Sequence, residues 1–289
     1  MSTVEPPLTR PLGHRIPGPS AVGEDPRRFL RLSWVIASTD FKLKFFGSAL
    51  GYLWQVMKPL LLFGVLFVVF TQVVDLGEGV RYYATALLLG IVLFSFLREM
   101  TAGATRILVD REALLRKVAF PRLALPFAVV ITATLNLVLN LVAVVVFLLV
   151  EGGRPQIDWL QLPVILGALT FLGLGLAMLL SASFVRYRDV DPIWDVMLQA
   201  LFYASPIFYP VQIITGANAD LIVRLLLFNP FATLVQQARH AFIDPSHPSA
   251  ATAMGGVEWL AVPGAITLAV FVWGMLTFRR MAPKVAELL

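Results

Sequence analysis

LALPFAVVITATLNLVLNLVAVVVFLLV, at Leu123–Val150, is the stretch that decides the fold. It contains no charged residue. It is also longer than the roughly 20 apolar residues with which a helix crosses a hydrocarbon core about 30 Å thick. A second uncharged stretch, Leu160–Val185, follows a short connection. Both stretches therefore predict membrane-spanning helices.

Four further apolar stretches lie outside this pair: Gly51–Val74, Tyr82–Arg106, Pro192–Ile214 and Leu260–Phe278. Two of them are imperfect. The second contains Arg98 and Glu99, and the third contains Asp195 and two prolines. We still predict a helix for each, which gives six transmembrane helices in all.

The composition supports a chain that lies mostly in lipid. Hydrophobic residues make up 58% of the sequence and charged residues 14%, whereas a soluble domain carries about 25% charge. We predict an all-α polytopic membrane protein with one membrane domain at residues 26–289. Residues 1–25 are rich in proline and predict an irregular cytoplasmic tail without the apolar core of a signal peptide.

The distribution of basic residues predicts the orientation. Arginines and lysines gather before the first span, between spans two and three, between spans four and five, and after the sixth span. The other connections hold only Arg81, Arg154, Arg224 and Arg239. Because basic loops stay in the cytoplasm, both termini are expected to be cytoplasmic. The expected location is the cytoplasmic membrane, crossed several times.

The segment at residues 26–46, before the first span, predicts an amphipathic helix at the inner membrane surface. Its basic face and the aromatics beside it suit the headgroup region. The residues concerned are Arg27, Arg31, Trp34, Lys42 and Phe45. A helix that only anchors the chain and a helix that docks a partner are equally compatible with this pattern.

A short charged segment, VDREALLRKVAFPRLALP at Val109–Pro126, lies in the predicted loop between spans two and three. Asp110 can cap a short helix that Pro121 ends. Exposed leucines beside basic residues suit a protruding segment that binds a partner protein. An ordinary positive-inside loop explains the same residues, and the residues alone favour that simpler interpretation.

Charged residues also mark the inner end of the predicted bundle, at Arg186, Arg188, Asp189 and Asp191. Within span two, Arg98 is expected to face a cavity or a partner, because a charge at bilayer depth is costly. Pro206 is expected to break span five. Beyond it, a short polar segment at Phe231–Phe242 predicts a re-entrant or surface helix on the outer side.

Aromatic residues near these segments are candidates for lining a pathway, because rings stack on the apolar faces of sugars. Interface anchoring and helix packing explain the same residues. The candidates are Trp54, Tyr82, Tyr83, Phe94, Phe96, Tyr203, Phe208 and Tyr209, with Arg98 beside them.

Several classes of chemistry lack their motifs. The sequence contains no cysteine, no G-x-x-x-x-G-K-[ST] and no H-E-x-x-H, so no ATP site, thiolate chemistry or metal site is expected in this chain. The basic residues sit at helix ends and not on one compact face, which argues against nucleic-acid binding. We therefore expect a transport subunit and no enzyme.

Four stretches together resemble the membrane subunit of type-2 ABC exporters, in the branch that exports lipid-linked polysaccharides, O-antigens and teichoic acids. They are FKLKFFGSALGYLWQVMKPLLLFGVLFVVF at Phe41–Phe70, LLRKVAFPRLALP at Leu114–Pro126, FVRYRDVDPIWDVMLQALFYASPIFYPV at Phe184–Val211 and NPFATLVQQAR at Asn229–Arg239. The adjacent Arg98 and Glu99 depart from the milder residues expected at the cytoplasmic mouth of this family.

The resemblance implies a homodimer that works with two copies of a separately encoded ATPase, which binds ATP and magnesium. It implies that the coupling segment consists of Leu114, Leu115, Arg116, Lys117, Phe120, Pro121 and Arg122. It also implies that residues 26–46 form the interface helix and that the segment around Pro230–Phe242 closes the outer gate. An exporter of a drug or small lipid is an alternative, and a membrane glycosyltransferase is a more distant one.

Overall fold

A computed structural model describes residues 25–46, 51–76, 79–113, 121–282 and 285. The described residues form helices and connecting loops, with no β-strand among them. Five helices are long and apolar enough to cross a membrane. The predicted class, an all-α polytopic membrane protein, is therefore confirmed.

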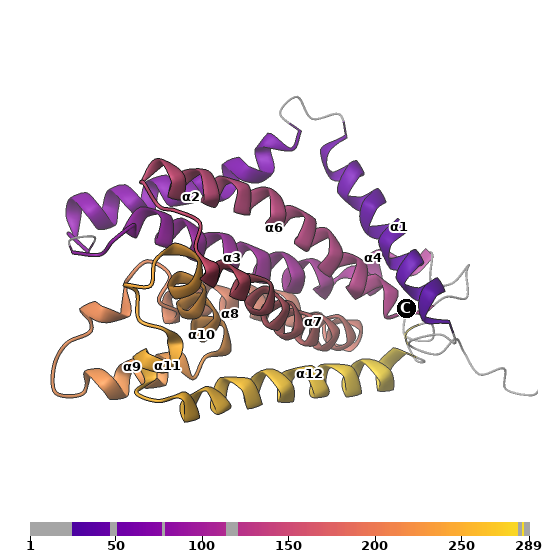
Figure 1. The fold of residues 1–289 in the computed structure, drawn as a ribbon. Coiled ribbons are helices and arrows are strands. Elements are labelled where there is room, and N and C mark those ends of the chain that lie inside the picture. The colour runs from indigo at the N-terminus through magenta and orange to yellow at the C-terminus, as the bar shows by residue number, and fades with distance from the viewer. Residues whose placement is uncertain (1–24, 47–50, 77–78, 114–120, 283–284, 286–289) are drawn as a thin grey trace, which may run out of the picture.

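These five candidate spans run alongside one another (Figure 1). Three of the spans include a short helix of another type: η1 continues α2, η2 precedes α7 and η5 precedes α12. Their bounds are α2 Leu53–Val68 with the π-helix η1 Val69–Val73, α3 Tyr83–Thr105, α6 Ala124–Val150, η2 Ile157–Gln161 with α7 Leu162–Arg186, and η5 Val257–Leu260 with α12 Ala261–Met281.

The fifth predicted span differs from the expected single helix over Pro192–Ile214. Helix α8 runs from Val190 to Ala204 and has 15 residues, which at about 1.5 Å per residue is roughly 22 Å. Ser205 then takes an extended conformation, with φ −103° and ψ 146°. A residue that precedes proline is disfavoured in the helical region, so Pro206 explains why the helix ends there.

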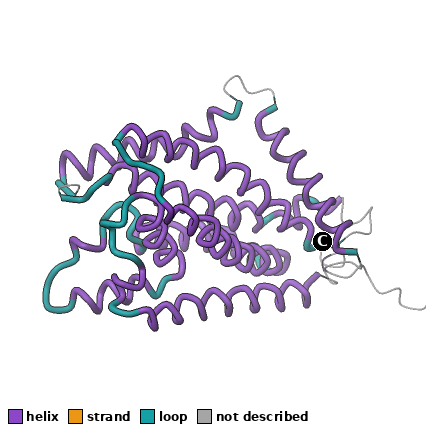
Figure 2. The backbone as a smooth tube through the Cα atoms, viewed as in Figure 1, coloured by secondary structure: helices purple, strands orange, loops and turns teal. Residues whose placement is uncertain are grey.

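Short helices fill the end of the bundle beyond this break (Figure 2). Two of them meet at 102° across a break of the kind found in a re-entrant loop or a broken span. One is α9, and the other is α10 continued by the π-helix η4. The bounds are η3 Val211–Ile213, α9 Ala219–Leu227, α10 Pro230–Ala238, η4 Arg239–Ile243 and α11 Ala250–Met254.

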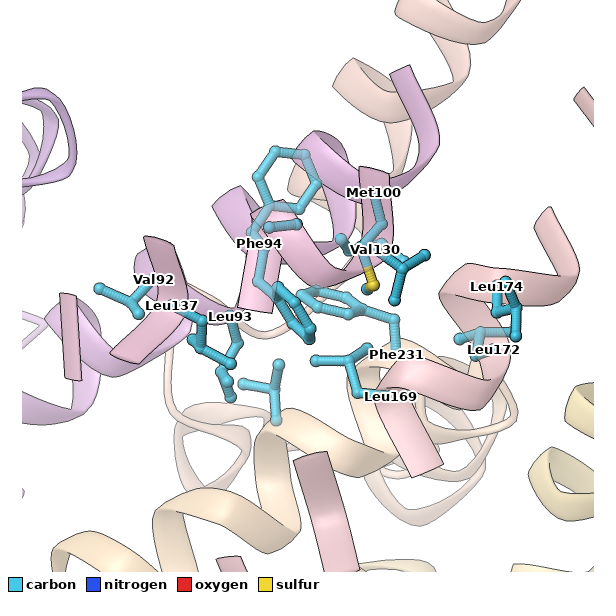
Figure 3. Packing of buried hydrophobic residues seen from close by; sticks show 14 of the residues in the cluster. Val92, Leu93, Phe94, Met100, Val130, Leu137, Leu169, Leu172, Leu174 and Phe231 are labelled. Carbon is cyan, nitrogen blue, oxygen red and sulfur yellow. The ribbon is translucent and has the colours of Figure 1, made fainter. Parts of the chain in front are cut away.

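Helix α3 lies at the centre of the fold. It packs against α2, α6, α7 and α8, and 72% of its most apolar window is buried, against 11% for α2 and for α12. Figure 3 shows Phe94, Met100 and Phe231 within this core. A helix that is apolar on every side is expected to be central. The four helices around α3 are arranged by packing against it.

The opposite end of the bundle carries α1, Pro26–Phe45, and the short α4, Ile107–Asp110. Helix α1 lies across the ends of the spans (Figure 1). It packs on α6, where the rings of Phe29 and Phe127 lie 5.0 Å apart. An ion pair joins Asp40 to Arg111, just before the charged inner segment.

Helices α7 and α12 cross at two glycines. A Cβ atom added to Gly274 would lie 2.1 Å from the carbonyl oxygen of Gly175, and one added to Gly175 would lie 2.7 Å from the Cα of Phe271. Close backbone approach at small residues is the usual way in which helices pack in a membrane. This contact holds α12 against the bundle.

Candidate functional site

A chain of aromatic rings connects the break after α8 to three other elements. Phe208 stacks on Phe70 of η1 at 4.8 Å, and it lies 6.2 Å from Phe202 and 6.0 Å from Tyr203. Phe202 in turn lies 4.9 Å from Phe94 of α3. Tyr209 and Phe231 complete this group of seven rings, which we call the aromatic cluster.

The aromatic cluster adjoins a pocket between α2, α3 and α8. This pocket has a volume of about 490 Å³ and shares Phe94, Phe202 and Tyr203 with the cluster. Its polar lining includes Arg98, Asp195 and Gln199, and the other lining residues are Leu62, Ser95, Val196 and Leu198. Aromatic and apolar walls with a few polar groups are typical of ligand sites.

Helix α8 leaves most of its surface uncovered within the chain. Leu198 is its only buried residue, and Tyr203 is 60% exposed. Helix α2 beside it exposes Leu61, Leu62 and Val65. The pocket therefore lies on a face that is open to a partner, to lipid or to a substrate. Tyr203 is the exposed ring of the aromatic cluster, whereas Phe94 and Phe231 are buried and the other four rings are half-buried.

Arg98 and Glu99 both line a pocket between α1, α3 and α6, but their other contacts differ. Arg98 also lines the pocket between α2, α3 and α8, whereas Glu99 accepts a hydrogen bond from Gln55 Nε2 at 2.6 Å and another from Asn136 Nδ2. Lys44 Nζ of α1 lies 4.0 Å from Glu99. Successive helical residues point about 100° apart, so Arg98 also reaches the second pocket and Glu99 joins four helices.

The charged residues at the carboxyl end of α7 and the start of α8 form specific contacts. Asp191 forms an ion pair with Arg106, at the end of α3, and not with its own neighbours. The guanidinium of Arg188 lies 4.9 Å from the Phe184 ring, and that of Arg186 lies 5.2 Å from the Tyr187 ring. Asp189 is exposed beside them. From the sequence these residues could pair with each other or with the basic segment that begins at Arg106, and for Asp191 the structure shows the second arrangement.

The remaining aromatic candidates lie apart from the aromatic cluster. Trp54 is 46% exposed near the start of α2, and Phe96 is 2% exposed in the core. Tyr82 and Tyr83 line a separate pocket of about 480 Å³ with Glu151, at the amino end of α3. Tyr83 also reaches the break, because its hydroxyl donates to the carbonyl of Phe208 at 2.6 Å.

Residues that sequence reasoning missed complete the site. Phe70, Phe202 and Phe231 belong to the aromatic cluster. Two of them were signalled by the sequence: Phe202 precedes Tyr203, and Phe231 follows the Asn-Pro pair that begins α10. Phe70 carried no such signal, because it lies in a continuous apolar run.

The proposed inner contact sites are described only in part. Leu114, Leu115, Arg116, Lys117 and Phe120 lie outside the described residues. Pro121 is half-buried, and Arg122 is 5% exposed.

The interface helix is described except for one side chain, that of Phe45, which lies outside the described part. Arg27, Arg31 and Lys42 are exposed, and Trp34 is 54% exposed. The described ranges contain no group of three or more His, Cys, Asp or Glu side chains that can hold a metal.

Comparisons with known proteins agree with this architecture. The sequence profile of the ABC-2 type transporter family matches residues 31–243. The chain is 30% identical over 216 residues to the O-antigen export system permease protein RfbA of Myxococcus xanthus, which covers 74% of this chain and 81% of the relative. It is 23% identical over 259 residues to a protein of the same name from Klebsiella pneumoniae, covering 88% and 93%.

Proposed function

The chain belongs to the ABC-2 type transporter family, and from this premise we propose that it is the membrane subunit of an exporter of a lipid-linked polysaccharide. Its proposed place is the cytoplasmic membrane, with both termini in the cytoplasm. The similarity to O-antigen export permeases along most of the chain supports this substrate class.

The aromatic cluster is the observation that carries the proposal. Sugars present apolar faces that stack on aromatic rings, and their hydroxyls need hydrogen-bonding partners. The open face of α2, α3 and α8 offers both, with rings at the break after α8 and Arg98, Asp195 and Gln199 below them. A glycan can slide along such a surface without a single tight site.

A second copy of the chain is proposed to close the pathway. Helices α2 and α8 are apolar but largely unburied in one chain. Two copies that face each other through these helices would enclose two aromatic clusters around one passage. The lipid anchor would remain in the bilayer beside the passage, where apolar chains are stable.

A separate ATPase is proposed to drive transport from the cytoplasmic side. No P-loop occurs in the sequence, so the nucleotide must be hydrolysed elsewhere. Two copies of that ATPase would push on residues 114–122. The ion pair of Asp40 with Arg111 ties the start of this segment to α1, so movement there would be transmitted to the interface helix.

The aromatic cluster provides the test. Replacing Phe208 or Phe202 with Ala should lower export of the glycan about threefold to tenfold, since an aromatic pair contributes about 0.5–1.5 kcal/mol beyond its buried area. Phe208→Trp should retain most of the export. The measurement is the amount of polysaccharide at the surface of cells that depend on the variant.

Trp259→Ala is the matched control. Trp259 is also an outer-side aromatic, and it packs on Phe228 at 5.9 Å, away from the aromatic cluster. Its loss should leave export close to normal at equal protein level. Normal export by Phe208→Ala and Phe202→Ala would overturn the role proposed for the cluster.

A further inference from the structure

The backbone break after α8 leaves polar groups that the helix no longer satisfies. The last carbonyls of a helix lack intrahelical donors, and Pro206 and Pro210 have no N–H group to offer. Residues 205–210 are nevertheless packed into the protein, with Ser205 and Ile207 fully buried. Their carbonyls therefore need donors from other elements.

Arg239 supplies two of these donors. One guanidinium nitrogen, Nη2, donates to the carbonyl of Ile207, and Nη1 lies 3.5 Å from the carbonyl of Tyr209. The side chain is 3% exposed, and none of the ion pairs among the described residues includes it. Its hydrogen bonds among the described residues therefore go to backbone carbonyls, and its buried Nε has no hydrogen-bond partner there.

Two other side chains hold the same segment. The hydroxyl of Tyr83, from α3, donates to the carbonyl of Phe208 at 2.6 Å. Asn229 Nδ2, at the start of α10, donates to Ser205 Oγ at 3.0 Å. Three consecutive carbonyls, those of residues 207 to 209, thus each face a side-chain donor.

Packing fixes the segment from the other side. A Cβ atom on Gly90 would lie 3.2 Å from Ile207 Cγ2 and 3.3 Å from its carbonyl oxygen. A side chain at this position would push Ile207 away by a few tenths of an ångström, so glycine lets α3 lie close against the break. The carbonyl of Ile207 is therefore held between Gly90 and Arg239.

We propose that Arg239 is a positioning residue, which holds the break so that the ring of Phe208 stays in the aromatic cluster. Burying a guanidinium is costly, and here it fixes the backbone on both sides of the ring that stacks on Phe70. The consequence for glycan movement rests on the proposed function, but the positioning itself does not.

The guanidinium group, with its two terminal nitrogens, is essential to this role. Its nitrogens reach two carbonyls that are two residues apart, whereas lysine offers one compact charge. Arg239→Lys should therefore keep the charge but release one carbonyl. Arg239→Met should release both.

Hydrogen–deuterium exchange of the full chain in nanodiscs tests the positioning without any transport assay. Arg239→Lys and Arg239→Met should speed exchange of peptides covering 205–210 at least about tenfold, with α6 unchanged. Tyr83→Phe should produce a smaller increase in the same peptides. If Arg239→Met does not fold, Tyr83→Phe and Arg239→Lys are the variants that test the proposal. Unchanged exchange at 205–210 in these variants would overturn the proposal.

Arg224→Met is the matched control for exchange. Arg224 is another outer arginine that donates to a backbone carbonyl, that of Met254, at 3.0 Å from Nε. Its replacement should speed exchange near Met254 and leave 205–210 unchanged. Equal acceleration at 205–210 would show general loosening of the outer end, and that result would also contradict the proposal.

A double-mutant cycle, with glycan export as the readout, shows whether Arg239 acts by positioning Phe208 or only stabilises the protein. Arg239→Lys should lower export in the normal chain but have little further effect when Phe208 is already Ala, because both changes remove the same ring contact. Additive losses would contradict action through Phe208. Faster exchange without any effect of Phe208→Ala on export would leave the positioning intact and refute only the proposed function.

Discussion

At the scale of single residues, neighbours decide what a charged or aromatic side chain does. The sequence identified Arg98 and Glu99 as unusual, but it could not show how their contacts differ. The donors to Glu99 come from residues 44 and 37 positions away, Gln55 and Asn136. Such long-range contacts leave no local pattern, so only the folded chain reveals them.

The buried His247 predicts a response to acid in the loop that follows η4. Burial and the nearby charge of Arg239 lower its pKa to about 4. Its Nε2 donates to the carbonyl of Arg81 at 3.1 Å. Asp244, whose pKa is also lowered, forms an ion pair with Arg81 at 3.4 Å, and His240 Nδ1 donates to the carbonyl of His247.

In the unfolded loop the imidazole of His247 takes up a proton near pH 6.5, whereas in the folded loop it does so only near pH 4. The folded loop therefore loses stability relative to the unfolded loop as the pH falls from about 6.5 to 4. Hydrogen exchange of residues 244–249, corrected for its intrinsic pH dependence, should therefore rise by roughly tenfold for each pH unit between about 6 and 4.5. His247→Gln, which keeps a donor, should remove this rise. A rise of the same size in His247→Gln would assign it to another group.

At the scale of elements, hydrophobic length predicted most helices, because a bilayer imposes a minimum length on a span. Span five was the exception. The sequence signalled the break at Pro206 but not its extent, since the path of residues 205–210 depends on donors from α3, α10 and η4. The sequence predicted four of the seven rings in the aromatic cluster, namely Phe94, Tyr203, Phe208 and Tyr209. The other three join them through contacts between elements that are far apart in the sequence.

The crossing of α7 and α12 gives a prediction at this scale. Gly274→Ala or Gly175→Ala should destabilise the protein by about 1–3 kcal/mol, because each new methyl group meets backbone at 2.1 or 2.7 Å. Gly167→Ala on α7 and Gly264→Ala on α12 are the controls, since nothing lies within 4 Å of their Cβ positions.

The thermal unfolding midpoint of the purified chain in one detergent is the measurement. It should fall for the first pair of variants and stay level or rise for the controls, because alanine favours a helix more than glycine does. Equal midpoints for all four variants would mean that the two helices do not cross at these glycines.

At the scale of the whole molecule, the charge asymmetry and the uncovered faces of α2 and α8 point beyond a single chain. Basic residues gather at the end that carries α1, and the aromatic cluster lies at the break near the other end. Both features fit the proposed function, in which the basic end meets a separate ATPase and the open face meets a second copy of the chain. Of the segment proposed to contact the motor, residues 114–120 lie outside the described residues, and Pro121 and Arg122 lie just before α6.

The most direct test of this account is transport of a lipid-linked polysaccharide into vesicles that contain the chain with or without its separately encoded ATPase. The account predicts ATP-dependent transport only when both proteins are present. It also predicts loss of transport-coupled hydrolysis in the double variant Arg116→Glu and Lys117→Glu, with Arg280→Glu as the control that retains it. Transport by the chain without the ATPase, or unchanged coupling in the double variant, would contradict the account.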